Sequence, residues 1–253
     1  MNLFNIEGKK AIVTGAAQGL GNGIAEGLME AGVEVSLVDI SKDTNKAVDT
    51  FRGRGFKCHG VNADLADKSE LVRAFDESVK NLGGDLDIIV NAAGIQKRHL
   101  SEKFPFEDWL SIIDINLNAV FMLCQLVGQQ FINQNSCGKI INIASVLSFF
   151  GGYTVPAYAA SKGGVAQLTK ALSNEWASKG INVNALAPGY IDTEMNVDII
   201  KDTKRRSEIL ARIPAKRWGT PTDMKGAAVF LASNASNYIN GAIIPVDGGY
   251  MSR

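Results

Sequence analysis

Short runs rich in β-branched residues alternate with longer helix-like stretches along the whole chain, and this alternation constrains the fold more than any other feature. Strict alternation of strand and helix predicts right-handed crossovers and a parallel sheet that is covered by helices on both faces. No internal repeat or low-complexity linker interrupts the pattern. We therefore predict one α/β domain over residues 1–253, built on a doubly wound parallel sheet (a Rossmann fold).

The predicted strands cover residues 10–14, 33–39, 56–61, 87–91, 139–145, 181–187 and 242–245. The predicted helices cover residues 19–31, 42–52, 67–81, 107–133, 157–179 and 221–232. One segment, residues 191–219, breaks the rhythm because it is long, polar and rich in Lys and Arg. We predict that this lid segment covers a binding site, and the alternative is a solvated surface excursion.

The first predicted strand runs into a glycine-rich turn, TGAAQGLG at residues 14–21, which opens the first helix. Glycines permit a tight turn and let backbone N–H groups approach a pyrophosphate at the positive end of a helix. The spacing differs from the general G-x-G-x-x-G pattern, but its place between a strand and a helix indicates a dinucleotide site. The candidate contacts are Gly15, Gln18, Gly19 and Leu20.

Asp39 ends the second predicted strand, where this fold places an acidic side chain against the adenosine ribose. Such a carboxylate repels a 2′-phosphate, and no Arg lies beside it, so we expect NAD rather than NADP as the cofactor. The alternative is an Asp that caps a helix or sits in a loop. Further candidate cofactor contacts follow the third and fourth strands, namely Asp64, Leu65, Asn91, Ala92 and Gly94.

The charge balance, 26 Lys and Arg against 26 Asp and Glu, gives no basic footprint of a nucleic-acid-binding protein. No signal-peptide core begins the chain, and no apolar run reaches membrane-spanning length, so we expect a cytoplasmic protein without a membrane partner. The three cysteines lack metal-type spacing and the two histidines cannot form a metal site alone, so we expect no metal.

Tyr158 and Lys162 lie four residues apart in a predicted helix and therefore share one face of it. A cation at that place favours phenolate, so we expect the pKa of Tyr158 to be lowered toward neutrality. Ser145, at the end of a predicted buried strand, adds a hydroxyl nearby. The three side chains predict a site for alcohol–ketone redox chemistry. The alternative is a helix with a half-buried Tyr and a solvated Lys.

These motifs at these spacings resemble the short-chain dehydrogenase/reductase family over nearly the whole chain. Three segments match the cofactor site of this family: the glycine turn, the NAAG motif at residues 91–94 and the loop after the sixth strand. In that loop the matching residues are Pro188, Gly189, Ile191 and Thr193. Ala92 departs slightly, since many members carry a second Asn there. The resemblance implies four catalytic residues, Asn116, Ser145, Tyr158 and Lys162.

By this resemblance, Tyr158 exchanges the proton with the substrate oxygen and Ser145 holds that oxygen. Lys162 lowers the pKa of Tyr158 and binds the nicotinamide ribose, and Asn116 connects Lys162 to solvent through water. Hydride transfer places negative charge on oxygen, and positioned donors stabilise it.

Cations near the expected cleft indicate an anionic substrate, because Arg binds a carboxylate through two parallel hydrogen bonds. Arg98 follows the fourth strand and Arg205 lies in the lid segment, although each is also compatible with a plain surface charge. Stretches such as residues 140–152 and 212–219 resemble sugar-acid dehydrogenases of the family. The resemblance implies a 2-dehydro-3-deoxy-D-gluconate substrate, with gluconate as the alternative.

Two other functions remain open at this point. A 3-oxoacyl-carrier-protein reductase shares the fold, although it usually uses NADP, and a non-catalytic NAD-sensing protein usually loses Tyr or Lys. The predicted helix at 107–133 carries more apolar residues than one core-facing stripe needs, which implies a partner helix. The apolar end at 242–245, with Tyr250 and Met251, is a candidate second interface. We expect a homotetramer, and a dimer is the alternative.

Overall fold

Seven parallel strands form the centre of the molecule in a computed structural model that describes residues 2–252. The order in the sheet is β3-β2-β1-β4-β5-β6-β7, and every neighbouring pair is parallel. This confirms the predicted single doubly wound domain. The strands are β1 (Lys10–Thr14), β2 (Glu34–Asp39), β3 (Cys58–Asn62), β4 (Ile88–Asn91), β5 (Gly138–Ile143), β6 (Ile181–Pro188) and β7 (Ile243–Val246).

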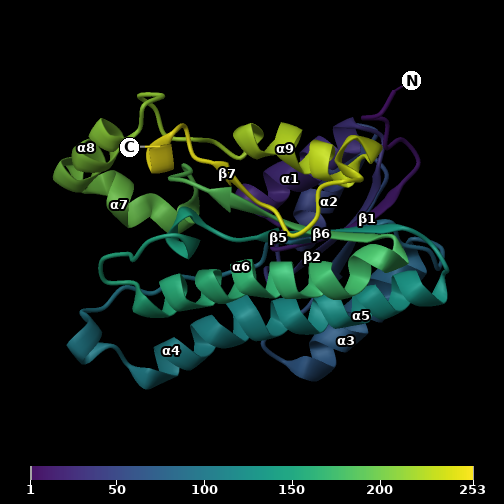
Figure 1. Cartoon of the computed structure of the whole chain (residues 1–253), viewed down its shortest axis with the longest axis horizontal. Helices are drawn as coiled ribbons and strands as arrows, with labels where there is room; N and C mark the ends of the chain where they lie inside the picture. Colours follow the sequence, from purple (N-terminus) through teal and green to yellow (C-terminus); the bar gives the residue numbers. More distant parts are fainter. Residues whose placement is uncertain (1, 253) are drawn as a thin grey trace.

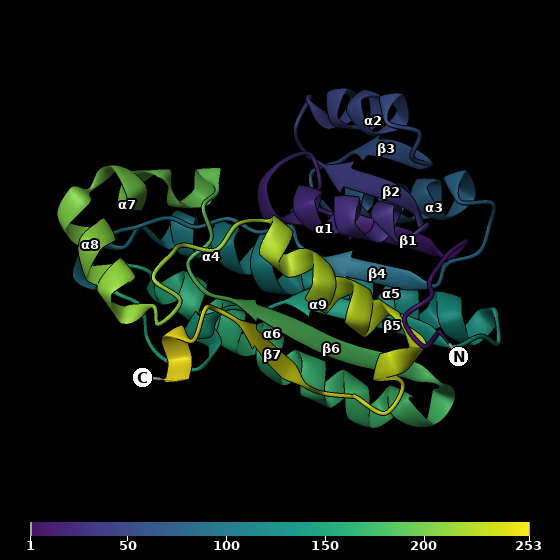
Figure 2. The same ribbon diagram turned by 90° about the horizontal axis from the view of Figure 1, so that it is seen from above.

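Helices cover both faces of this sheet, as Figures 1 and 2 show. One layer contains α1 (Gly19–Glu30), α2 (Thr44–Gly53) and α9 (Thr222–Ala232). The opposite layer contains α3 (Lys68–Asn81), α4 (Phe106–Ile113), α5 (Ala119–Asn133) and α6 (Pro156–Trp176).

Each layer packs its own hydrophobic core against the sheet. On β1, Ile12 packs into the α3, α5 and α6 side, whereas Ala11 and Val13 pack into the α1 and α9 side. This alternation follows from the two-residue period of a strand. All six residues of β5 are buried, as expected for a strand covered on both faces. The continuous apolar runs in the sequence therefore reflect burial from both sides.

The strand order reverses between β1 and β4, and this reversal places a crevice at the carboxyl ends of the two strands. Thr14, the last residue of β1, ties the two strand ends together there. Its hydroxyl oxygen accepts hydrogen bonds from the backbone N–H groups of Ala92 and Ala93, each at 3.1 Å. The glycine turn after β1 and the NAAG motif after β4 consequently lie against each other.

The predicted single helix over residues 107–133 is interrupted. α4 and α5 are joined by a π-helical turn, Asp114–Asn118, in which the N–H of Ala119 donates to the carbonyl of Asp114. The whole run Phe106–Gln134 has 29 residues and is apolar enough, by length and composition alone, to span a membrane. This corrects the expectation that no segment reaches that length. Its buried residues, such as Leu123 and Val127, pack against the sheet.

The lid segment (residues 191–219) contains two helices that the sequence did not reveal, α7 (Val197–Lys201) and α8 (Thr203–Arg212). They lie together at one end of the molecule (Figures 1 and 2). The segment is closed at its base, because Ile191 and Gly219 form a parallel β-bridge and the N–H of Asp192 donates to Gly219 O at 2.8 Å. Ile199, Ile209 and Ile213 of this segment form a small buried cluster with Tyr250 from the C-terminal end of the chain, whereas Ile191 at its base packs into the main core.

Candidate active site

The glycine turn forms a cradle that side chains would fill. Gly15 and Gly19 have φ angles of +65° and +62°, a region that favours glycine. A Cβ atom at Gly15 would lie 2.7 Å from the Cα atom of Ala93, so the NAAG backbone passes directly beside it. Gln18 is the extended N-cap residue of α1, and Leu20 packs partly into the core below. The open N–H groups at the start of α1 fit a pyrophosphate.

Asp39 lies at the carboxyl end of β2, beside this cradle. Its carboxylate accepts hydrogen bonds from the backbone N–H groups of Ala17 and Ser41, both at 2.9 Å. The side chain therefore links the glycine turn to the loop after β2 and presents a negative charge at the edge of the cradle. Asp64 and Leu65 follow β3, with Asp64 partly exposed and Leu65 buried. These positions fit the adenosine part of a dinucleotide.

The NAAG motif contributes backbone rather than its Asn side chain. Asn91 is 1% exposed, and its amide nitrogen donates to Asn142 Oδ1 at 2.9 Å inside the core. The side chain thus joins β4 to β5, and the predicted cofactor contact of Asn91 could only be made by its backbone. Ala92 and Gly94 continue along the crevice. A Cβ atom at Gly94 would lie 3.2 Å from Asn116 Oδ1 and 3.7 Å from Lys162 Nζ.

The loop after β6 closes the other side of the crevice. Pro188 ends β6, and a Cβ atom at Gly189 would lie 2.8 Å from the Cα atom of Asp247. Ile191 is buried in the core at the base of the lid segment, so its side chain holds the loop rather than lining the crevice. Thr193 reaches the cradle, since a Cβ atom at Gly19 would lie 3.8 Å from Thr193 Cβ. The crevice thus fits a dinucleotide that runs from Asp39 to Gly94.

Ser145, Tyr158 and Lys162 meet at the carboxyl end of β5. Ser145 follows β5 and caps a 3₁₀ turn, and its hydroxyl faces the phenol of Tyr158 closely enough to lower the pKa of that phenol. Tyr158 lies in the first turns of α6, and Lys162 Nζ lies 5.6 Å from the centre of its ring. Lys162 is 3% exposed and donates to the carbonyl of Ile143 at 2.6 Å.

The pKa of Tyr158 shifts in the direction opposite to the expectation. Burial raises the pKa of Tyr158 to about 12, and this outweighs the lowering by the Ser145 hydroxyl and the charge of Arg98. Burial also lowers the pKa of Lys162 to about 8. Desolvation disfavours the charged form of each group. The phenol is therefore protonated at neutral pH. The expectation of a lowered Tyr158 pKa rested on the four-residue spacing to Lys162 and took no account of desolvation.

Asn116 lies in the π-helical turn between α4 and α5 and is fully buried. Its side-chain amide pairs with the backbone of Ile95, accepting from the N–H at 2.8 Å and donating to the carbonyl at 3.0 Å. It also donates to Ser161 Oγ at 3.2 Å. The side chain thus fixes the loop after β4 to the helix that carries Tyr158 and Lys162.

Both predicted substrate arginines line the cavity in front of Ser145 and Tyr158. Arg98 is partly buried, and burial together with the nearby charge of Arg205 lowers its pKa. Gly189 was predicted from the sequence, but most other lining residues were not. Among these, Tyr190 contacts Trp218 and Tyr250 through its ring. Tyr190 directly follows Pro188 and Gly189 in the sequence, and this position in the predicted cofactor loop could have indicated that it lines the cavity. The structure thus brings together the Tyr158 phenol, the Ser145 hydroxyl and two cations in one cavity.

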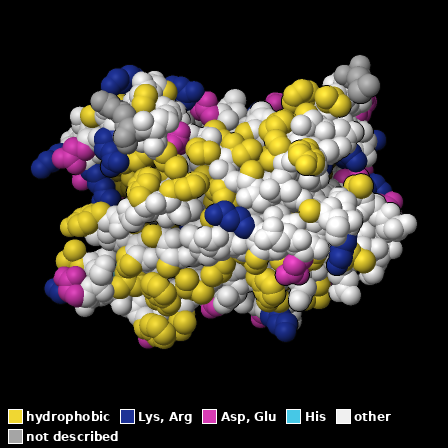
Figure 3. Space-filling view, in the orientation of Figure 1, with side chains coloured by type: hydrophobic (Ala, Val, Ile, Leu, Met, Phe, Trp, Pro, Cys, Tyr) yellow, Lys and Arg dark blue, Asp and Glu magenta, His cyan; other side chains and the backbone are white. Residues whose placement is uncertain are grey.

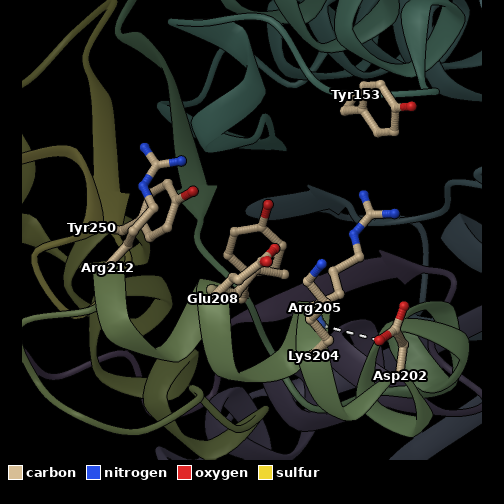
Figure 4. A pocket seen from close by; sticks show the side chains of 9 residues that line it. Tyr153, Asp202, Lys204, Arg205, Glu208, Arg212 and Tyr250 are labelled. Atoms are coloured by element: carbon tan, nitrogen blue, oxygen red, sulfur yellow. Dashed lines mark hydrogen bonds between the residues drawn. The ribbon is translucent and has the colours of Figure 1, made fainter.

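A wider hollow of about 510 Å³ adjoins this cavity beneath α8, and Figure 4 shows its side chains. Tyr153, Tyr190 and Arg205 line both spaces. Arg212 lies over the ring of Tyr250, with 4.4 Å between the guanidinium carbon and the ring centre. Tyr250 is 3% exposed, so this residue packs against the lid segment and is not free to form the expected interface.

Comparisons with known proteins agree with this geometry. A family model described as enoyl-(acyl carrier protein) reductase matches residues 15–251. Two relatives named 2-dehydro-3-deoxy-D-gluconate 5-dehydrogenase are similar over the full length. The one from Pseudoalteromonas atlantica is 49% identical over 99% of this chain and 98% of its own, and the one from Dickeya dadantii is 47% identical over 100% and 99%.

A solved structure gives the same picture of the fold. The gluconate 5-dehydrogenase from Burkholderia cenocepacia, in complex with NADP and tartrate, has a TM-score of 0.95 and is 39% identical. The similarity covers 100% of this chain and 98% of that chain. The family resemblance found in the sequence is therefore confirmed.

Proposed function

The chain belongs to the short-chain dehydrogenase/reductase family, and we propose that it is a NAD(H)-dependent dehydrogenase of sugar acids. The reaction is the interconversion of 2-dehydro-3-deoxy-D-gluconate and its 5-keto form. One observation carries the proposal: Arg98 and Arg205 line the same cavity as Ser145 and Tyr158. A substrate that places a carbonyl at Tyr158 and a carboxylate at the arginines fits this arrangement, and the names of the two closely similar relatives support it.

The proton route follows from the burial of Tyr158. In the reductive direction, its phenol donates a proton to the oxygen that gains negative charge, while the Ser145 hydroxyl donates a hydrogen bond to the same oxygen. A phenol with a pKa raised to about 12 is fully protonated beforehand. Lys162, whose pKa is lowered to about 8, stays mostly cationic at neutral pH and stabilises the phenolate that remains. The nicotinamide cofactor supplies or accepts the hydride.

Arg98 and Arg205 are proposed to bind the substrate carboxylate. Arg98 extends from the loop after β4, and Arg205 extends from α8 of the lid segment, so they reach the cavity from different elements. Their charges repel each other, which is part of the reason that the pKa of Arg98 is lowered. An anion between them would relieve this repulsion and gain bidentate hydrogen bonds. The lid segment would thereby close over an acidic substrate.

NAD is proposed as the preferred cofactor because of Asp39. Its carboxylate is held by Ala17 and Ser41 at the place expected for the adenosine ribose, where a 2′-phosphate would meet its negative charge. The structure of the Burkholderia relative contains NADP, so the choice has to be measured in this chain. The test is the ratio of kcat/KM for NADH to that for NADPH. A ratio of one or less would contradict the proposal.

Assembly into a cytoplasmic homotetramer is the remaining part of the proposal. In the described chain, α4 and α5 leave Phe106, Phe121 and Ile132 exposed at 67%, 44% and 45%. Figure 3 shows hydrophobic side chains gathered along this side of the molecule, over α4 and α5. A second chain would cover them. Light scattering on the purified protein gives the molar mass directly, and a monomer would contradict this proposal.

Gluconate is the alternative substrate, favoured by the structural match to a gluconate 5-dehydrogenase. The experiment that separates the two is a screen at fixed pH, with NADH consumption followed by absorbance. The panel contains 2,5-diketo-3-deoxygluconate, 5-ketogluconate and a neutral ketose. We expect the highest kcat/KM for the 3-deoxy compound. A higher value for 5-ketogluconate would support the alternative, and turnover of the neutral ketose alone would contradict both.

A further inference from the structure

The loop of residues 94–100 after β4 carries Arg98, and its side chains point in two directions. Gln96 and Arg98 line the cavity in front of Tyr158. Lys97 and His99 point the other way and bind Asp108, near the start of α4. Neighbouring side chains of an extended backbone alternate in this manner. Fixing the second pair of side chains therefore fixes the direction of the first.

Asp108 uses both of its carboxylate oxygens for this contact. Oδ1 accepts from Lys97 Nζ at 2.6 Å, and Oδ2 lies 2.7 Å from His99 Nε2. Lys97 and His99 together hold the pKa of Asp108 below its usual value. The carboxylate also lies in the first turn of α4, where a negative charge is favourable. One side chain thus joins two points of the loop, on either side of Arg98, to a helix.

Other hydrogen bonds hold the two ends of the loop, and Asp108 binds the side chains on either side of Arg98. Asn116 pairs with the backbone of Ile95, and the N–H of His99 donates to Thr154 O at 3.0 Å. The guanidinium of Arg98 has one hydrogen bond, to Gln96 Oε1 at 3.0 Å, and Gln96 lies on the same cavity wall. Nothing else in the described residues hydrogen-bonds the Arg98 side chain. Its direction therefore depends on the backbone between Lys97 and His99.

We propose that Asp108 is a positioning residue for substrate recognition, which holds Lys97 and His99 so that Arg98 points at the substrate carboxylate. The residue touches neither the cavity nor the reacting atoms. Its effect is to reduce the conformations that Arg98 has to give up when an acid binds, which is the usual source of affinity in a preorganised site. This inference rests on the proposed carboxylate role of Arg98.

The test is the variant Asp108→Asn in the full-length protein, assayed with NADH. An Asn side chain keeps the size but loses the charge and one acceptor. We expect KM for 5-ketogluconate to rise about tenfold, the scale expected for the loss of a charge-assisted hydrogen bond. We expect kcat, and KM for a neutral ketose, to stay within about twofold of the original values. A general structural defect would lower kcat and affect both substrates alike.

The matched control is Glu107→Gln, since Glu107 is an exposed acidic residue in the same helical turn. It removes the same charge from the start of α4 and should leave KM for the acid within about twofold. An equal rise in both variants would overturn the proposal, because it would trace the effect to the helix rather than to the loop. If Asp108→Asn does not fold, the double variant Lys97→Ala/His99→Ala removes both side-chain partners of Asp108 and releases the loop while Asp108 remains.

Arg98→Ala separates this inference from the proposed function. If Asp108 acts through Arg98, the double variant Arg98→Ala/Asp108→Asn has the same KM for the acid as Arg98→Ala alone. Additive effects would overturn the positioning role. If Arg98→Ala raises KM for the acid but Asp108→Asn does not, only the present inference fails. If Arg98→Ala affects acid and neutral ketose equally, the proposed carboxylate role fails instead.

Discussion

One wall of the cavity carries the proposed reacting groups Ser145, Tyr158 and Lys162, and it is built differently from the segments that face it, the 94–100 loop and the lid segment. Ser145 and Lys162 are 6% and 3% exposed, Ser145 directly after β5 and Lys162 on α6, and both elements belong to the main core. The lid segment packs on a separate small cluster, in which Ile199, Ile209 and Ile213 contact Tyr250 from the C-terminal end. No residue of the 94–100 loop is fully buried, and the loop is fastened by hydrogen bonds and by the ring contact of His99 with Phe104. The chemical groups are thus held rigidly, and the cations that would select the substrate are held lightly.

This difference separates two tasks. A proton can be transferred only when the donor is positioned to within a fraction of an ångström, so a buried support is an advantage. Substrate entry requires movement, and weakly packed segments open at low free-energy cost. Changes in the wall should therefore impair turnover of every substrate, whereas changes in the facing segments should alter which substrate is chosen.

The largest effect is expected for Tyr158→Phe, which removes the proposed proton donor. We expect kcat to fall by about 10³-fold or more for acid and neutral ketone alike, while NADH still binds. Single-turnover absorbance assays measure the rate of turnover, and fluorescence titration measures the affinity for NADH. Tyr238→Phe is the control, since Tyr238 is fully exposed on the surface. Substantial activity of Tyr158→Phe would break the distinction between the two regions.

The pH dependence of the reduction rate tests the proposed role of Lys162. Burial lowers the pKa of Lys162 to about 8, so the cation is present below that pH and is lost as the pH rises through it. We expect kcat for reduction to be flat near pH 7 and to fall about tenfold per unit well above pH 8.

Lys139 provides the matched control for this profile. It lies at the opposite end of β5, and burial lowers its pKa to about 8 as well. Lys139→Met should leave the pH profile of kcat unchanged, whereas Lys162→Met should remove the decline along with most of the activity. A profile that follows Lys139 instead would show that the decline reflects stability rather than catalysis.

Much of the difference between the buried wall and the segments that face it can be predicted from the sequence, because buried strands and helices carry a periodic pattern of apolar residues. The strands and the glycine turn were found correctly, since apolar runs and glycines report directly on a parallel sheet and its crevice. The two helices of the lid segment were missed because α8 is mostly polar and buries only Ile209. The predicted direction of the Tyr158 pKa shift was wrong, because the sequence gives the spacing to Lys162 but not the burial, whose effect on the pKa is larger.

Contacts that join distant segments were also beyond the sequence. Nothing in the pattern indicates that Asn91 turns toward Asn142 or that Tyr250 packs against Tyr190. The interruption by the π-helical turn at Asn116 leaves no change in apolar periodicity, so a continuous helix was expected. Such features depend on the packing of elements that are far apart along the chain.

A smaller effect is expected for stability, and it compares the two cores directly. Ile24→Ala in α1 should lower the free energy of unfolding by about 2–5 kcal/mol, because Ile24 is fully buried in a main core. Ile209→Ala in α8 should cost less than about 1 kcal/mol, since the lid segment can open without global unfolding. Urea denaturation followed by circular dichroism measures both. Equal losses would mean that the lid segment is part of the same cooperative unit.

The most direct test of the central claim compares wild type and Arg98→Ala on two substrates. The quantity is kcat/KM for 5-ketogluconate and for a neutral ketose, measured with NADH at one pH. We expect the variant to lose about tenfold to a hundredfold on the acid, through KM, and less than about twofold on the neutral ketose. Equal losses on both substrates would show that Arg98 supports the wall rather than selecting the acid, and would contradict the division of tasks between the two regions.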